Sequence, residues 1–101
     1  MKNKKDSLIP EARKILVILG HNIRFARKRR MLAEKKFAEQ AGISRSTLQL
    51  IEKGSPGVAM SSYIQVLFLL GMQRDLLKIA TNDTTGWKIL EAGLFLPRNK
   101  E

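Results

Sequence analysis

The chain has 101 residues, which is enough for one small domain and too few for two full ones. Hydrophobic residues make up 44%, enough to fill a core, and the absence of cysteine excludes a disulfide scaffold, thiolate metal sites and thiol catalysis. No apolar stretch approaches the roughly 20 residues that span a bilayer, and the charged N-terminus does not resemble a signal peptide. We therefore expect a soluble, cytoplasmic domain with no membrane contact.

Positive charge is concentrated in the first half of the chain. The net charge is +10, and residues 1–57 carry 14 Lys and Arg against 5 Asp and Glu, whereas residues 58–101 carry 5 against 4. The densest run lies between Arg24 and Arg30. This run could be a solvated helix face or could meet a membrane surface, but only Phe25 offers an interfacial aromatic ring nearby. A nucleic-acid backbone is the polyanion that the pattern favours.

The first predicted element is an amphipathic helix from Pro10 to about Arg30, because apolar residues recur there at spacings of three and four. Pro10 and Glu11 suit a first helical turn. Gly20 weakens the pattern and marks a point where the helix could divide in two. The expected inward face consists of Ala12, Ile15, Leu16, Leu19, Ile23 and Ala26.

A second helix is predicted from about Leu32 to Ala41. Gly42 follows it and can adopt the positive φ that ends a helix. Ser44 then provides an N-cap oxygen for a third helix that reaches about Lys53. Residues 54–57 form a turn by composition.

A fourth helix is predicted over residues 63–70, with Ser61 or Ser62 as its cap. This helix is apolar nearly all round, so we expect the C-terminal segment or a second copy of the chain to cover it. Residues 73–80 form a fifth predicted helix and residues 81–86 a loop.

A short sixth helix is marked by Trp87, Leu90 and Leu94, and Pro97 ends it. No alternating strand pattern is present. The expected fold is all-α, with five to six helices.

Residues 34–53 carry the most specific pattern, E-K-K-F-A-E-Q-A-G-I-S-R-S-T-L-Q-L-I-E-K. Ala38 must be small where two short helices approach closely, and Gly42 makes the turn between them. The shared apolar wedge consists of Phe37, Ala41, Ile43, Leu48 and Ile51. A generic corner of two helices is the alternative, but the coincidence of these positions with a basic flank favours a DNA-binding helix-turn-helix, whose second helix enters the major groove.

Residues 19–72 resemble the phage-repressor-type (XRE/Cro) helix-turn-helix family, through L-G-H-N-I-R-F-A-R-K-R-R before the motif, I-S-R-S-T-L-Q-L-I-E-K-G within it and L-L-G after it. The whole chain, with D-T-T-G-W-K-I-L-E-A-G-L-F-L-P-R at its end, is also similar to HipB-type antitoxins paired with HipA-type kinases. The resemblance implies a phage-repressor-like DNA-binding domain at 19–72, with the motif at 34–53 and the recognition helix at 44–53. An N-terminal arm and leading helix (1–18) and a C-terminal dimerisation or partner extension (73–101) flank it.

The resemblance also implies roles for individual residues. Arg45 is the best candidate base reader, because a guanidinium fork matches guanine O6 and N7. The base-reading set is Arg45, Ser46, Gln49 and Leu50. The set that contacts the DNA backbone is Ser44, Thr47, Lys53, Ser61, Ser62 and Lys35. Arg27 and Glu52 are implied to be a structural pair, not DNA contacts.

Two positions depart from the family pattern. Glu34 stands where a phosphate-contacting Gln is common, and because phosphate repels a carboxylate we expect Glu34 to turn away, toward Lys35 or Arg30. Leu50 stands where the family often has a polar or basic base reader, and it could meet a thymine methyl or simply pack.

No catalytic, cofactor-binding or metal-binding set is expected. His21 is the only histidine, cysteine is absent and the carboxylates are scattered, so neither a metal cluster nor a nucleophile with a base can be assembled. We expect no enzyme activity.

The sequence leads to a homodimeric repressor on a palindromic double-stranded operator, because one recognition helix reads only a few base pairs. Trp87 is either a plug over the fourth helix or a partner anchor. The dimer or partner contact is expected on Phe68, Leu76, Leu77, Trp87 and Leu90. If the chain is an antitoxin, the same side binds a HipA-type kinase. The alternatives are a solitary phage-like or controller regulator and an interaction adaptor that uses the fold as a scaffold.

Overall fold

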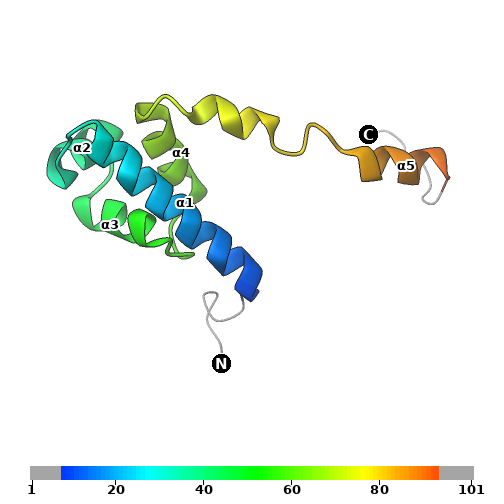
Figure 1. The fold of residues 1–101 in the computed structure, drawn as a ribbon, viewed down its shortest axis with the longest axis horizontal. Coiled ribbons are helices and arrows are strands. Elements are labelled where there is room, and N and C mark those ends of the chain that lie inside the picture. Colours follow the sequence, from blue (N-terminus) through cyan, green and yellow to red (C-terminus); the bar gives the residue numbers. More distant parts are fainter. Residues whose placement is uncertain (1–7, 94–101) are drawn as a thin grey trace.

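The computed structural model describes residues 8–93, and these residues form five α-helices and one 3-10 helix (Figure 1). In chain order the elements are α1 (Pro10–Arg29), α2 (Glu34–Ala41), α3 (Arg45–Lys53), α4 (Met60–Leu69), η1 (Gln73–Lys78) and α5 (Thr84–Glu91). No strand occurs among the described residues, so the expected all-α fold is confirmed.

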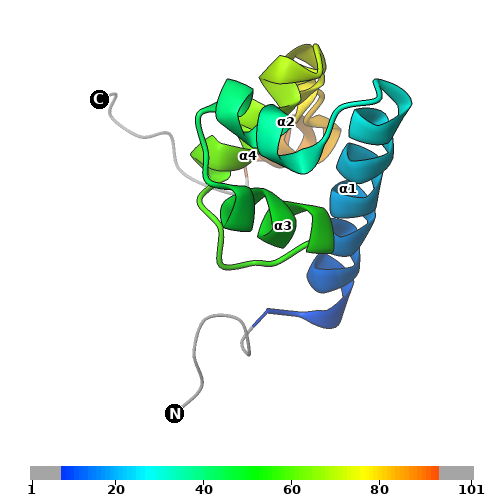
Figure 2. The same cartoon turned by 90° about the vertical axis from the view of Figure 1, so that its left-hand side faces the viewer.

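Helices α1 to α4 pack around one apolar core. The long helix α1 lies against α3, and α2 contacts both α3 and α4 (Figure 2). The largest fully buried side chains come from all four helices: Phe37, Ile23, Leu48, Ile51 and Val66. The predicted wedge of the motif is therefore buried, except for Ile43, which is half-buried.

Helix α1 runs unbroken through Gly20, so the helix is not divided at the point where its sequence pattern weakens. Gly20 is buried, and a Cβ atom at this position would lie 2.5 Å from the Ile51 carbonyl oxygen. Glycine serves here as the place where α1 meets the end of α3. Ile15, predicted to face inward, is 62% exposed because the first turns of α1 project beyond the other helices (Figure 1).

Gly54 completes this contact from the other side. It ends α3 with φ +79°, and a Cβ atom on it would lie 2.5 Å from the Cα atom of Val17. Each glycine thus lies against the backbone of the other helix, and this close approach sets where α3 sits on α1.

Local capping residues end α2 and start α3, as predicted. Gly42 closes α2 with φ +74°, and the Ser44 hydroxyl accepts a hydrogen bond from the Thr47 N–H at 3.0 Å. Helix α2 begins at Glu34, two residues later than Leu32.

The C-terminal half differs from the prediction in its boundaries. Helix α4 begins at Met60 after Ala59, with no side-chain cap, so Ser61 and Ser62 lie in its first turn and do not cap it. The predicted fifth helix is a 3-10 helix that ends at Lys78.

Helix α5 begins inside the predicted 81–86 loop. Its N-cap is Asp83, whose carboxylate accepts a hydrogen bond from the Gly86 N–H at 3.0 Å. Leu94 and Pro97 lie outside the described residues.

Residues 79–93 form an arm that leads away from the four-helix bundle (Figure 1). The radius of gyration is 17.6 Å, against about 13 Å for a compact chain of this length. Neither η1 nor α5 contains a buried residue, and Trp87 is 62% exposed. Trp87 is therefore not a plug over α4. No helix in residues 8–93 is long and apolar enough to cross a membrane.

Candidate DNA interface

Helix α3 presents one buried face and one exposed face. Leu48 and Ile51 are fully buried, whereas Arg45, Gln49 and Leu50 are exposed. Leu50 is 43% exposed, so it does not pack into the core. Ser46 and Lys53 share the exposed surface of this helix. The four predicted base readers are thus brought together on the solvent side of α3.

A buried ion pair anchors α3 from behind. The Arg27 guanidinium donates from Nε to Glu52 Oε2 at 2.7 Å and from Nη2 to Glu52 Oε1 at 3.0 Å, and both side chains are only 6% exposed. The hydrogen bonding that Arg27 donates to the Glu52 carboxylate raises the pKa of Arg27. Arg27 Nη1 also donates to the Leu32 carbonyl oxygen at 2.7 Å. One arginine therefore ties α1, the α1–α2 connection and α3 together, away from the exposed face.

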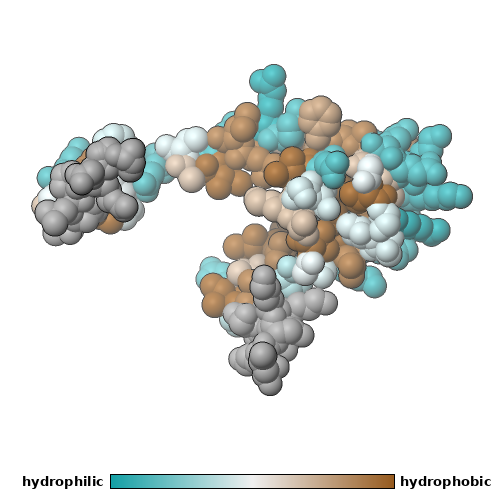
Figure 3. All heavy atoms as spheres, turned by 180° about the vertical axis from the view of Figure 1, so that it is seen from behind, coloured by the Kyte–Doolittle hydropathy of each residue, from teal (hydrophilic) through white to brown (hydrophobic). Residues whose placement is uncertain are grey.

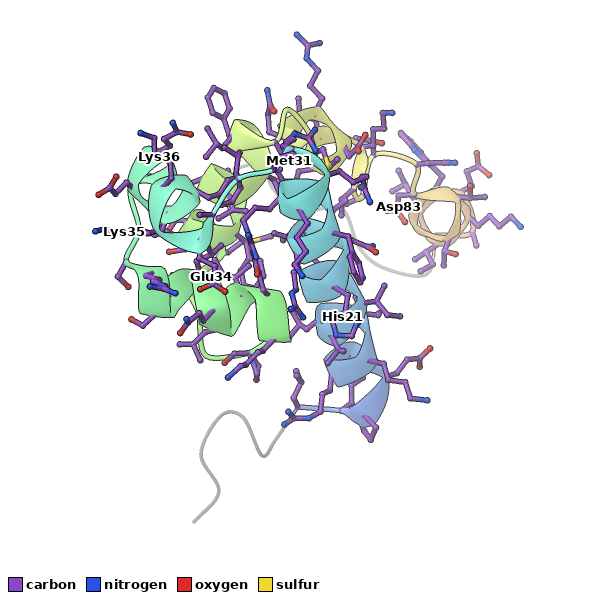
Figure 4. The ribbon with its side chains drawn as sticks, turned by 60° about the vertical axis from the view of Figure 1, so that its left-hand side comes forward. His21, Met31, Glu34, Lys35, Lys36 and Asp83 are labelled. Atoms are coloured by element: carbon purple, nitrogen blue, oxygen red, sulfur yellow. The ribbon has the colours of Figure 1, made fainter. Side chains whose placement is uncertain are left out.

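Glu34 lies at the start of α2, beside the exposed face of α3 (Figure 4). Its Oε1 atom accepts hydrogen bonds from Arg45 Nε and from Gln49 Nε2, each at 3.0 Å. The expectation that Glu34 turns toward Lys35 or Arg30 is therefore wrong. Arg30 instead donates to the carbonyl oxygens of Ala26 and Leu70, at 2.9 and 3.1 Å.

The pKa of Glu34 is lowered by the hydrogen bond from Gln49 and then by the one from Arg45. The carboxylate therefore stays ionised at neutral pH. No local signal reveals this contact, because Glu34 is 11 residues from Arg45 and 15 from Gln49 in the sequence.

Hydroxyl groups gather at the N-terminus of α3. Ser44 Oγ donates to Thr47 Oγ1 at 2.8 Å, and the Ser46 hydroxyl lies 3.1 Å from Ser44 Oγ. Thr47 is half-buried, whereas the two serines are exposed. These groups stand beside the backbone N–H groups of a first helical turn, where an anion such as phosphate is stabilised.

The remaining predicted backbone contacts come from three elements. Lys35 is exposed and points outward from α2 (Figure 4), Lys53 ends α3, and Ser61 and Ser62 lie in the first turn of α4. Ser62 is half-buried and Ser61 exposed.

Arg24 is a further residue of this surface; the sequence analysis included it in the basic run that favours a nucleic-acid partner but gave it no individual contact. It lines a polar hollow of about 290 Å³ beside α3, together with Glu34, Gln49 and Lys53. Its spacing of three residues from Arg27 on α1 is the signal that could have identified it, because residues three apart share a helix face.

The predicted dimer or partner residues do not form one patch. Leu76 lines an apolar groove of about 440 Å³ with Leu19 and Leu67, whereas Phe68 lines a separate hollow on the α2–α4 side. Trp87 and Leu90 lie on α5. Apolar side chains are exposed over much of the rear face and the base of the arm (Figure 3). Leu77, at that base, is 74% exposed.

Comparison with known proteins finds a family match for the central part of the chain. Residues 23–62 match the helix-turn-helix family, over about two fifths of the chain. The matched segment starts in α1, contains α2 and α3 and ends in the first turn of α4. No curated protein and no solved structure matches the chain. The family match supports a DNA-binding domain of the XRE type in a transcription regulator, a kind of domain that is not typically enzymatic.

Proposed function

We propose that this chain, with its XRE-type helix-turn-helix, is a transcriptional repressor that binds a palindromic double-stranded operator as a homodimer. The observation that carries the proposal is α3, whose apolar side is locked onto α1 while Arg45 and Gln49 stay exposed. A short helix held in this way can enter the major groove with its N-terminal residues toward the bases. The DNA-binding domain is proposed to span residues 19–72, preceded by a leading segment at 1–18 and followed by a partner extension at 73–101.

The proposed contacts divide into base readers and phosphate contacts. Arg45, with a guanidinium fork, and Gln49, with an amide, have the donors and acceptors that distinguish bases, and the exposed Leu50 suits a thymine methyl group. Ser46 completes the base-reading set. Phosphate contacts come from residues around the rim of this surface, which are Ser44, Thr47, Lys53, Ser61, Ser62 and Lys35.

A binding series tests this proposal. The probe is a labelled duplex from the chain's own upstream region, compared with a scrambled duplex at several salt concentrations. If a dimer neutralises about 6–10 phosphates, the log–log salt slope lies near −5 to −9. The native duplex is expected to bind about 10³-fold more tightly than the scrambled one.

Two arginine variants distinguish base reading from a general effect of charge. Arg45→Ala should remove most of the sequence preference, whereas Arg74→Ala, which removes the same charge from the exposed surface of η1, should leave the preference intact. Absence of binding at low salt would refute DNA binding. Full activity of Arg45→Ala would favour the adaptor alternative.

The homodimer is proposed to form through the arm. Helix α5 has eight residues and none is buried, although isolated helices shorter than about 12–15 residues are marginal in water. Trp87 and Leu90 lie three residues apart on one helix face and remain exposed. A second copy of the chain supplies the matching surface, because the groove lined by Leu19, Leu67 and Leu76 is apolar and belongs to every copy.

Charge complementarity supports this pairing. Arg29 and Asp75 line the same groove, and α5 carries Lys88 and Glu91, so both charges of α5 can meet an opposite one at the edge of the groove. Exposed ion pairs of this kind contribute little affinity but set the orientation of partners.

Sedimentation and small-angle scattering test the arm. The wild-type chain should be a dimer, and Trp87→Ala should weaken its association about tenfold or more, whereas Thr85→Ala on the same exposed helix should have little effect. A wild-type monomer with a radius of gyration near the roughly 13 Å of a compact chain would mean that the arm folds back onto its own bundle.

The finer proposal is an antitoxin that represses its own promoter and binds a HipA-type kinase through the C-terminal extension. Its support is the sequence similarity of that extension together with the exposed Trp87. We expect a neighbouring reading frame to encode a kinase-like protein. That protein should co-purify with the wild-type chain and not with the Trp87→Ala variant. A neighbourhood without such a frame would favour the solitary regulator.

A further inference from the structure

The Glu34 carboxylate holds two outward-facing side chains of α3 at once. Its Oε1 atom accepts from Arg45 Nε and Gln49 Nε2, each at 3.0 Å, and the Glu34 side chain is 30% exposed. Arg45 and Gln49 are four residues apart, so they occupy the same face of the helix. The contact therefore links the two side chains that are best equipped to read bases.

The contact leaves the useful edge of Arg45 open. Nε is engaged by Glu34, whereas the terminal Nη1 and Nη2 groups make no hydrogen bond within residues 8–93. These two nitrogens form the fork that pairs with guanine O6 and N7. The Arg45 side chain is 61% exposed, so this fork is accessible to a large ligand.

The same contact decides how the Gln49 amide is turned. An ionised carboxylate can only accept hydrogen bonds, so the amide nitrogen must face Glu34. The second N–H and the Oε1 atom of Gln49 stay available as a donor and an acceptor. This is the pair that adenine N7 and N6 require.

We propose that Glu34 is a positioning residue for sequence readout, which orders Arg45 and Gln49 in their reading orientation before DNA arrives. The inference rests on the proposed DNA-binding function. Ordering the two side chains in advance lowers the entropic cost of placing them on the bases. A carboxylate near phosphates also weakens binding to every sequence by a similar factor, which cancels in the ratio of specific to non-specific affinity. The ordering of Arg45 and Gln49 acts on specific binding alone and therefore raises this ratio.

The test compares variants on the operator that the wild-type chain selects from a random duplex pool and on a scrambled duplex. Glu34→Ala should lower the specificity ratio about tenfold, since it frees two side chains. Its affinity for the scrambled duplex should rise slightly. Glu39→Ala is the matched control, because Glu39 is exposed on the same helix, its removal changes the charge equally, and within residues 8–93 its side chain makes no hydrogen bond or ion pair with α3. Glu34→Gln, which keeps an accepting oxygen, should recover part of the ratio.

A second readout separates positioning from folding. In the free protein, Glu34→Ala should increase the mobility of the Arg45 Nε–H group measured by nitrogen-15 relaxation, whereas Glu39→Ala should not. In the Arg45→Ala background, Glu34→Ala should cost less specificity than it does in the wild-type chain, because only its contact with Gln49 remains to be lost.

Three outcomes would overturn the inference. Equal effects of Glu34→Ala and Glu39→Ala on both duplexes would mean simple charge repulsion. A higher specificity ratio in Glu34→Ala would mean that Glu34 obstructs Arg45. A wild-type chain that binds without any sequence preference would refute the proposed function itself, and this result is visible before any variant is made.

Discussion

Replacing Gly20 with alanine is expected to destabilise the chain, although alanine is the better helix former. A new Cβ atom would lie 2.5 Å from the Ile51 carbonyl oxygen, 2.8 Å from the Glu52 carbonyl oxygen and 2.8 Å from the Gly54 nitrogen. All three are backbone atoms, so no side-chain rotation relieves the contact. Either α3 moves away from α1 or α1 bends.

The magnitude follows from two opposing effects. Overpacking a tight site costs about 3 kcal/mol at the upper end of its usual range. The higher helix propensity of alanine relative to glycine stabilises the helix by about 1 kcal/mol. The expected net loss is about 2 kcal/mol in the free energy of unfolding, which lowers the melting temperature by roughly 8–16 °C in a domain of this size.

Substitutions at two other glycines separate the cost of steric overlap from the cost of a left-handed backbone. Gly71 has φ +78°, and a Cβ atom added to it would meet nothing within 4 Å, so Gly71→Ala carries only the left-handed backbone cost of about 1–2 kcal/mol. Gly54 combines φ +79° with a Cβ position 2.5 Å from Val17 Cα, so Gly54→Ala should be the most damaging of the three.

Urea and thermal unfolding, followed by circular dichroism, provide the assay. The expected order of loss is Gly54→Ala above both Gly20→Ala and Gly71→Ala, with a lower DNA affinity for the two variants at the α1–α3 crossing. A Gly20→Ala chain as stable as wild type would refute the close approach of these helices.

Three further predictions concern the residues that hold α3. Arg27→Met should cost about 3–5 kcal/mol in urea unfolding because it leaves Glu52 buried without a partner, and adding Glu52→Leu should restore most of the loss; no recovery in the double variant would contradict this. Ser44→Ala should cost about 1 kcal/mol, since it removes the cap on the Thr47 N–H, and an unchanged urea midpoint would be the contrary result. Because the pKa of Glu34 is lowered in the folded state, its ionised carboxylate stabilises the fold above the unfolded-state pKa of about 4.3. This stabilisation is lost as the pH falls through the lower folded-state pKa. A carbon-13 titration of the Glu34 carboxyl with a midpoint at or above about 4.3 would contradict the contact.

The parts of the fold that depend on neighbouring residues could be predicted from the sequence. Gly42 and Ser44 act on the adjacent backbone, so the end of α2 and the start of α3 follow from residue type. The apolar spacing of Leu48 and Ile51 similarly predicts which face of α3 is buried.

Features that depend on distant contacts could not be predicted in this way. Gly20 weakens a helix locally, yet its role is set by Ile51 and Gly54, at the far end of α3. The sequence around Glu34 offers it basic neighbours, whereas its partners stand on another helix. Helix α4 begins at Met60, and Ala59 at its N-cap position provides no side-chain hydrogen bond, so residue type does not indicate where this helix starts.

The five residues between η1 and α5, residues 79–83, have no helical structure, and Ala80 among them has a positive φ of 69°. If two copies associate through their arms, this segment is the joint between the dimer contact and each recognition helix. The distance between the two α3 helices is then governed by the bend of a short connector instead of by a rigid interface. Under this proposal the regulator would tolerate operators whose half-sites differ in separation, and a single regulator would thereby serve promoters of unequal geometry.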